Sequence, residues 1–329
     1  MPQSARLLAL FDHSFPLRFL QDFMSEQSTN AVVMVRPCQF YPNPETALDN
    51  AFQSPVENTI SPNVRQEAEA EFDRAVEALS AAGIRVHVFA DTPSPAKPDA
   101  VFPNNWFSTH EDGRVALYPM YNPSRRPERR RDLIECLGQT YEVSEVIDYS
   151  DFEKRALYLE GTGSLVLDQI EHVAYASLSK RTAREPLEKF CADFHFRPLT
   201  FESTAADGRL IYHTNVMMCI GTGFALVGLE MIKDPKDRVK VRQQLEESGR
   251  TVIELTRDQV ENFAGNALEL HNNKERLLVL SARAAAHLEG AQIATLQKFV
   301  RLLPLSLPTI ELAGGSARCM MATIHLPHR

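Results

Sequence analysis

The sequence predicts an α/β fold built from about five repeated units around a central axis, which is a five-bladed α/β propeller. Four residues that can carry chemistry follow one another at equal intervals of 53 residues: Glu160, His213, Asn266 and Cys319. The segments around them share one layout, in which two apolar strands joined by a polar or glycine-containing turn precede a helix. A unit that repeats with a period near 53 residues indicates a closed array that gathers equivalent positions around one axis.

The repeated units can be followed along the chain by their strand pairs and helices. The strand pairs are predicted at residues 100–108 and 115–119, 156–167 and 172–178, 211–220 and 224–229, and 267–270 and 277–280. The helices are predicted at residues 127–137, from about residue 184, at 235–248 and at 284–302.

The two ends of the chain are predicted to complete the ring together. A buried strand at residues 31–36 and a helix at 62–82 that ends at Gly83 come first, and a lone strand from Cys319 to Leu326 comes last. If these segments form one unit, they close the ring and protect the edges of its sheets. We therefore expect a single catalytic domain over residues 1–329. The alternative is a doubly wound α/β fold with a parallel sheet, which the predicted hairpins disfavour because they imply mixed sheets.

Composition indicates a globular protein, and its charge argues against a nucleic-acid partner. Of the 329 residues, 44% are hydrophobic and 24% are charged, as is usual for globular proteins. The net charge of −8 argues against nucleic-acid binding, which needs clustered basic residues in a basic field. The basic run at residues 125–131 is interpreted as a solvated helix start, with the exception of Arg125.

The cysteines and the N-terminal stretch predict a cytoplasmic protein. The five cysteines are an odd number without C-x-x-C spacing, in a chain too large to need disulfide bonds. Residues 7–20 are interrupted by charged residues and a proline, so they form neither a secretory signal nor a membrane span. We expect no membrane partner, and the sequence leaves open whether the chain forms a homo-oligomer.

Cys319, His213 and Glu160 combine the residue types that a thiol-dependent active site requires. A nucleophilic cysteine needs a neighbour that is cationic or accepts a proton, and a histidine can move protons near neutral pH. Cys319 follows two glycines, which permit backbone conformations closed to other residues. Taken alone, each residue could be structural: a buried thiol, a hydrogen-bonded core histidine and a buried ion pair. Their common phase in the repeat favours the catalytic interpretation.

Glu160 indicates the shape of the substrate. A carboxylate in an otherwise apolar segment is costly unless it has a cationic or hydrogen-bonding partner. A planar group with two N–H donors would satisfy it through paired hydrogen bonds, and guanidino and ureido groups have that shape.

Several short stretches resemble a known group of enzymes. They are P-D-A-V-F-P-N-N at 98–105, P-S-R-R at 123–126, L-E-G-T-G-S at 159–164, L-S-K-R-T at 178–182, Y-H-T-N at 212–215 and the terminal Cys319. In their order and joint occurrence, the chain resembles the guanidino-group-modifying enzymes of the pentein superfamily, which include arginine deiminases, dimethylargininases, amidinotransferases and succinylarginine dihydrolase. It looks most similar to the branch linked to citrulline use. The resemblance implies the pentein fold, a five-bladed α/β propeller.

The resemblance also implies roles for the residues of the 53-residue series. Cys319 would be the nucleophile, His213 the general acid and base, and Glu160 the ligand of the planar head group. Asn266 gains no such role, and it either contacts the substrate or occupies the corresponding turn of its unit.

Further residues would bind the amino-acid part of the substrate. By the same resemblance, Asp99, Arg125 and Arg181 would hold its α-amino and α-carboxylate groups. Dimethylargininases have an acid where this chain has Asn105, and arginine deiminases have one where it has Asn215.

These departures bear on the choice of substrate. The family's common E-G-G-D is E-G-T-G-S here, so we expect fewer carboxylates than in a site built for a guanidinium cation. Because an amide can also donate a hydrogen bond to a carbonyl oxygen, Asn105 favours a neutral ureido substrate of the citrulline type over arginine. The resemblance to succinylarginine dihydrolases, which act on a guanidino group, weakens that preference.

We therefore expect a cysteine hydrolase of C–N bonds in a ureido or guanidino amino acid. It would give ornithine or citrulline plus ammonia through a covalent thioester-like intermediate. No metal or organic cofactor is required, and the sequence shows no cluster of metal ligands. Two alternatives stay open: an amidinotransferase, in which an amine instead of water resolves the intermediate, and a non-catalytic binding protein similar to the ribosome anti-association factors of the same fold.

Overall fold

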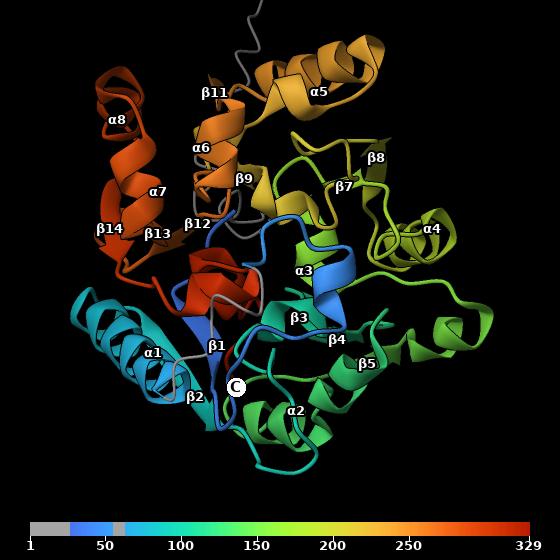
Figure 1. The fold of residues 1–329 in the computed structure, drawn as a ribbon. Coiled ribbons are helices and arrows are strands. Elements are labelled where there is room, and N and C mark those ends of the chain that lie inside the picture. The colour runs from blue at the N-terminus through green and yellow to red at the C-terminus, as the bar shows by residue number, and fades with distance from the viewer. Residues whose placement is uncertain (1–26, 55–62) are drawn as a thin grey trace, which may run out of the picture.

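Five small sheets form a ring in the computed structural model, which describes residues 27–54 and 63–329 (Figure 1). The strands are, sheet by sheet, β15 (Ala322–Thr323), β1 (Ala31–Arg36) and β2 (Arg85–Ala90); β3 (Phe107–Thr109), β4 (Arg114–Leu117) and β5 (Glu145–Asp148); β6 (Val166–Asp168), β7 (Val173–Ser177) and β8 (Arg197–Phe201); β9 (Met218–Ile220), β10 (Phe224–Val227) and β11 (Thr251–Glu254); and β12 (Leu268–His271), β13 (Arg276–Ser281) and β14 (Arg301–Leu305). The predicted five-unit propeller is confirmed. The N-terminal stretch at residues 7–20 lies outside the described residues.

One pairing pattern recurs in all of these sheets. The middle strand pairs antiparallel with the strand named first and parallel with the strand named third. The antiparallel pairs include the hairpins predicted from the sequence. The third strands were not predicted, because strands such as β5 and β11 are mostly exposed and lack a buried apolar face. Parallel pairing requires a crossover, which the helices supply.

The crossover helices lie on the outside of the ring (Figure 1). They are α1 (Val64–Ala81), α2 (Arg131–Leu137), α4 (Arg184–Asp193), α5 (Pro235–Glu247), and the pair α7 (Ala282–His287) and α8 (Gly290–Leu296), and a short helix, α6 (Arg257–Glu261), follows β11. The single helix predicted over 284–302 is wrong, because Glu289 caps a new helix and β14 begins at Arg301. In the described ranges, none of the helices combines the length and the apolar character that crossing a membrane requires.

Short helical turns, instead of strands, carry the predicted catalytic residues. These turns are η4 (Pro103–Asn105), α3 (Gly161–Ser164), η7 (Thr214–Val216) and η10 (Ala317–Met320), each just ahead of the first strand of a sheet. Glu160 and His213 immediately precede such a turn, and Cys319 lies within one. The prediction of continuous strands through these three residues is therefore wrong. The turns look strand-like in sequence because they are buried, with α3 packed against η4 and η7, and η10 packed against η4.

The first and last described segments close the ring. β15 pairs antiparallel with β1, so the two ends share a sheet as predicted. Ile324 donates its backbone N–H to the carbonyl oxygen of Ala31 at 3.0 Å, and Ile324 and Leu326 pack with Val33 in one apolar core. Both edges of β1 are therefore paired. The assignment of residues 1–329 to a single catalytic domain stays a prediction.

Candidate active site

The helical turns converge on a narrow cavity with about 280 Å³ of space free of atoms. Six residues predicted for the site line it: Asp99, Asn105, Arg125, Arg181, His213 and Cys319. The other wall residues are Thr46, Asn50, Phe102, Tyr212, Ala313 and Gly315. Glu160 and Asn266 are fully buried and contact residues of this wall from behind. Residues from distant parts of the chain thus meet at one site.

The sulfur of Cys319 faces two side-chain amides. Nδ2 of Asn266 lies 3.2 Å from Sγ, and Nδ2 of Asn215 lies 3.4 Å from it. Asn266 is itself fixed, because its Nδ2 also donates to the carbonyl oxygen of Asn215 and its Oδ1 accepts the backbone N–H of Arg318. N–H groups aimed at sulfur stabilise a thiolate more than a thiol. Asn266 therefore lies against the predicted nucleophile.

Glu160 and His213 form a buried acid–histidine pair. Nε2 of His213 donates to Oε2 of Glu160 at 2.8 Å, and the backbone N–H of Tyr121 donates to Oε1 at 2.9 Å. Burial opposes ionisation of Glu160, but Arg181, His213 and Arg125 outweigh it and lower its pKa to about 2. Burial lowers the pKa of His213 to about 4, although Glu160 acts in the opposite direction. Near neutral pH, a neutral His213 thus faces an ionised Glu160 and keeps Nδ1 as a proton acceptor.

Arg125 connects three side chains of the cavity wall. Its Nε and Nη2 donate to the two oxygens of Glu128 at 3.0 and 2.8 Å, and its Nη1 donates to Oδ1 of Asn105 at 2.8 Å. Asp99 lies 3.7 Å from Nε. Burial raises the pKa of both acids, to about 7 for Glu128. Since Nδ2 of Asn105 donates to Asn104 at 3.1 Å, both ends of the Asn105 amide are already hydrogen-bonded within the protein.

Arg181 is tied to residues 43–54, which we call the covering segment. Its Nε and Nη2 donate to the carboxylate of Asp49 at 2.9 and 2.6 Å, and its Nη1 lies 3.6 Å from Oε2 of Glu160. At the start of the covering segment, Asn43 donates to Asp99 at 2.7 Å. Its blue helical turn, η2 (Thr46–Leu48), is seen near the centre of the ring in Figure 1, and Thr46 lines the cavity. Arg181 therefore links the covering segment to the acid–histidine pair.

The described residues place four carboxylates and two guanidinium groups around the cavity. The acids are Asp49, Asp99, Glu128 and Glu160, and the cations are Arg125 and Arg181. Asp49 and Glu128 come from outside the stretches that resemble the family, and the expectation of fewer carboxylates than in a site built for a guanidinium cation stays a prediction. Within the described ranges, no three His, Cys, Asp or Glu side chains are placed to hold a metal ion.

Two glycines of the L-E-G-T-G-S stretch are needed for close packing. A Cβ on Gly163 would lie 2.7 Å from Nδ1 of His213 and 2.4 Å from Nδ2 of Asn105. A Cβ on Gly161, whose φ is +47°, would lie 2.4 Å from the carbonyl oxygen of Asn104. Side chains at either position would push apart the turns that assemble the site.

Several site residues escaped the sequence analysis. Glu128 carried a signal, since it lies three residues after Arg125 in one turn, η5 (Pro123–Glu128). Asp49 carried none, because it is 132 residues from Arg181 in a segment without regular periodicity. Asn215 differs from the acid that arginine deiminases have at this position, but the sequence does not predict its contact with Cys319, which depends on the fold.

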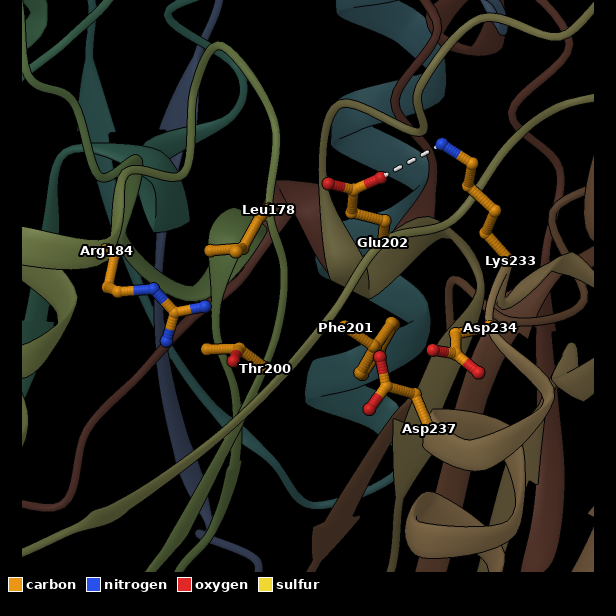
Figure 2. A pocket seen from close by; sticks show the side chains of 8 residues that line it. All are labelled: Leu178, Arg184, Thr200, Phe201, Glu202, Lys233, Asp234 and Asp237. Atoms are coloured by element: carbon orange, nitrogen blue, oxygen red, sulfur yellow. Dashed lines mark hydrogen bonds and ion pairs between the residues drawn. The ribbon is translucent and has the colours of Figure 1, made fainter.

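A separate open cavity of about 690 Å³ lies at the outer end of β8 and the start of α5 (Figure 2). Its charged wall residues are Arg184, Glu202, Lys233, Asp234 and Asp237. Figure 2 shows the ion pair between Lys233 and Glu202, whose nitrogen and oxygen lie 3.3 Å apart. Because the charges are mixed and the described wall holds none of the predicted site residues, the cavity at Cys319 is the candidate active site.

A family model describes most of the chain. The model of the eukaryotic N,N-dimethylarginine dimethylhydrolases matches residues 36–326. Among curated proteins, no sequence is similar enough to count as a relative.

Solved structures share the fold at low sequence identity. The substrate-bound N-terminal domain of ArgZ, an arginine dihydrolase from the ornithine–ammonia cycle in Cyanobacteria, is 15% identical with a TM-score of 0.70, over 90% of this chain and 98% of that domain. AgrE in complex with ornithine and NAD+ is 16% identical with a TM-score of 0.70, over 91% of this chain and 40% of AgrE. A dimethylarginine dimethylaminohydrolase variant carrying an S-methyl-L-thiocitrulline adduct is 14% identical with a TM-score of 0.60, over 91% of this chain and all 100% of that one. The chain spans 41% of full-length ArgZ. These matches confirm the expected pentein fold.

Proposed function

Because the chain belongs to the N,N-dimethylarginine dimethylhydrolase family, we propose that it hydrolyses a C–N bond in the amidino group of a guanidino amino acid, with Cys319 as the nucleophile. The observation that carries this proposal is the meeting of the Cys319 thiol with the Glu160–His213 pair in one cavity. The reaction requires a free thiol, so we propose a reducing compartment such as the cytoplasm.

The charge balance around the cavity favours a cationic head group. Two guanidinium groups face four carboxylates, so the site carries no excess positive charge even if burial keeps Asp99 and Glu128 protonated. An incoming cation would favour their ionised forms. A neutral ureido group can donate hydrogen bonds to these acids but carries no charge for them to attract, and the Asn105 amide that would favour it is occupied by Arg125 and Asn104. We therefore propose arginine or a methylated arginine as substrate, in place of the citrulline type that the sequence favoured.

The chemical steps follow from the positions of three side chains. Sγ of Cys319 bonds to the central guanidinium carbon, one C–N bond breaks, and the departing amine or ammonia takes a proton through His213. A water molecule that loses a proton to Nδ1 of His213 then attacks the carbon. The C–S bond breaks, the thiol is regenerated, and a ureido amino acid is released. Glu160 keeps His213 oriented through the 2.8 Å hydrogen bond and stabilises its protonated form.

The surrounding polar residues are assigned supporting roles. We assign Asn215 and Asn266 to stabilising the Cys319 thiolate through their N–H groups. Asp99 is suited to the α-amino group of the substrate, as the family resemblance implies. Arg181 has its Nε and Nη2 bound to Asp49, so we assign it to positioning Glu160 and the covering segment instead of holding the α-carboxylate.

An amine-release and product assay tests the proposed function. Arginine, dimethylarginine, citrulline and agmatine are offered to the wild-type protein, with Cys319→Ser as the inactive variant and Cys136→Ser as a matched control on α2. We expect turnover of arginine or methylated arginine that Cys319→Ser abolishes and Cys136→Ser retains. Turnover of citrulline alone would contradict the cationic substrate, and full activity of Cys319→Ser would contradict the mechanism.

The two alternatives make different predictions in the same assay. An amidinotransferase would need added glycine or another amine acceptor, so product formation in its absence argues for hydrolysis. A non-catalytic binding protein would consume no substrate, and substrates would leave the labelling rate of Cys319 by a thiol reagent unchanged.

A further inference from the structure

A second cavity, partly open to solvent, lies farther along the first strands of the sheets, beyond the turns that form the candidate active site. The space free of atoms inside it and at its mouth amounts to about 460 Å³. Its wall includes residues of β6, β9, β12 and β15, and therefore strands from four of the five sheets. No part of the proposed mechanism uses it.

Arg318 brings a positive charge to this cavity. Its Nη1 donates to the carbonyl oxygen of Met321 at 2.8 Å, while the structure gives its Nε and Nη2 no hydrogen-bond acceptor among the described residues. The free Nε–Nη2 edge of a guanidinium offers two parallel N–H groups, which match the two oxygens of an oxyanion. Burial lowers the pKa of Arg318.

The buried arginines of this chain show which chemical group a guanidinium binds with two parallel N–H groups. Arg125 and Arg181 each use Nε and Nη2 to hold a carboxylate, and Arg250 holds Asp168 through Nη1 and Nη2. In the described part of the chain, Arg318 forms no ion pair with an acid. Arg318 is partly buried, so its charge has lost part of its hydration without gaining a counter-charge among the described residues, and the cavity is electrostatically suited to an anion.

The remaining wall of the cavity does not oppose a negative charge. Among the described residues of the wall, none is an aspartate or a glutamate. Thr162, Thr323 and His325 supply polar groups, and burial keeps His325 neutral near pH 7 by lowering its pKa to about 4. Gln27 is already engaged, since it bonds to the backbone of Leu167, Gln169 and Ile220.

We propose that this cavity is a binding site for a small oxyanion, such as inorganic phosphate or a short carboxylate, held by the Nε–Nη2 edge of Arg318. The site is connected to the active site. The backbone N–H of Arg318 donates to Oδ1 of Asn266 at 3.1 Å, and Nδ2 of Asn266 lies 3.2 Å from Sγ of Cys319. An anion that fixes Arg318 therefore also restrains the amide that faces the nucleophile.

Thermal unfolding in the presence of anions tests the proposal without relying on activity. The full chain is titrated with phosphate, acetate and chloride at constant ionic strength. We expect saturable rises in melting temperature with phosphate and acetate, a smaller effect of chloride, which cannot use both N–H groups, and loss of the effect in Arg318→Met. Arg318→Lys keeps the positive charge but lacks the two parallel N–H groups of the guanidinium, so this variant should retain only part of the rise in melting temperature. Arg184→Met, in the cavity of Figure 2, is the matched control and should behave as the wild type does.

Two results would overturn the proposal. One is an equal anion effect in wild type and Arg318→Met, and the other is a wild-type rise that never saturates, as expected of a general salt effect. If Arg318→Met fails to fold, crystals of the wild type soaked in selenate decide the matter. An anomalous peak within hydrogen-bond distance of Arg318 supports the site, and its absence beside selenate peaks elsewhere contradicts it. Neither measurement depends on the proposed hydrolysis.

Discussion

At the scale of single residues, the environment of Cys319 consists of dipoles more than of charges. Among the described residues, the side chains that hydrogen-bond to its sulfur are Asn266 and Asn215, whose amide nitrogens lie at 3.2 and 3.4 Å. The histidine that shares the cavity is neutral near pH 7, because burial lowers its pKa to about 4. Activation of the thiol in the free protein therefore depends on amide donors, and an imidazolium forms only during turnover.

Replacing Asn215 with aspartate should suppress the reactivity of Cys319. The change removes an N–H donor and places a like charge beside the thiolate. We expect the rate of alkylation of Cys319 by iodoacetamide at a fixed pH near 7 to fall about tenfold or more. Mass spectrometry of the Cys319 peptide measures this rate, and the exposed Cys136 in the same sample is the internal control. An unchanged rate at Cys319 would contradict the assigned role.

His213 should titrate well below the usual range for histidine. Its lowered pKa of about 4 means that the folded protein resists protonation of a group that the unfolded chain protonates near pH 6.5. The stability contributed by this neutral group is present above about pH 6.5 and is lost as the pH falls toward 4, by about 3 kcal/mol in total. NMR titration of the ring, assigned with His213→Asn, measures the midpoint. A midpoint near 6.5 would refute the expectation.

At the scale of elements, α1 holds the loop that leads to the nucleophile. The carboxylate of Glu71 on α1 accepts the backbone N–H groups of Thr309 and Ile310 at 2.9 to 3.0 Å. These residues begin η9 (Ile310–Ala313), which is followed by Gly314 and η10 with Cys319. A helix on the outside of the ring thus fixes the approach of the catalytic turn.

Removing this anchor should cost both stability and activity. Glu71→Ala leaves buried N–H groups without acceptors, for which we expect a loss of about 2 to 3 kcal/mol in the free energy of unfolding. Turnover should fall at the same time, because Cys319 loses its fixed position. Urea unfolding and a turnover assay measure the two effects. Glu77→Ala, on the exposed face of the same helix, should change neither, and equal behaviour of the two variants would contradict the anchoring role.

At the scale of the whole molecule, ring closure depends on a two-residue strand. β15 completes the sheet of β1 and β2, and its flanking residues Ile324 and Leu326 are almost fully buried. Without β15, β1 would expose a free edge and the core between neighbouring sheets would open.

Truncation after Met321 should therefore destabilise the whole ring. Loss of two buried aliphatic side chains costs roughly 2 to 5 kcal/mol each, which approaches the entire stability of many domains. We expect the truncated chain to lack a cooperative thermal transition in circular dichroism. Truncation after Leu326 keeps β15 and its buried neighbours, so it should melt cooperatively. Similar melting temperatures for the two truncated chains would show that ring closure by β15 contributes little to the stability of the fold.

The sequence by itself determined the repeat, and the repeat determined the fold class. The 53-residue intervals and the strand pairs predicted a five-unit ring, because hairpins and apolar strands are set by local patterning. Ring closure by the two ends was predicted for the same reason. The equal spacing also singled out Glu160, His213, Asn266 and Cys319, which the structure brings together around one cavity.

Only the tertiary structure decided the local form of the site and its charge. The turns that carry the proposed catalytic residues look like strands in sequence, since their burial comes from contacts with other turns across the axis. Asp49 reaches Arg181 across 132 residues, and no local pattern encodes such a contact. That ion pair and the one between Glu128 and Arg125 changed the expected substrate from neutral to cationic. Charge balance is a property of groups that folding brings together, which is why the tertiary structure was needed to determine it.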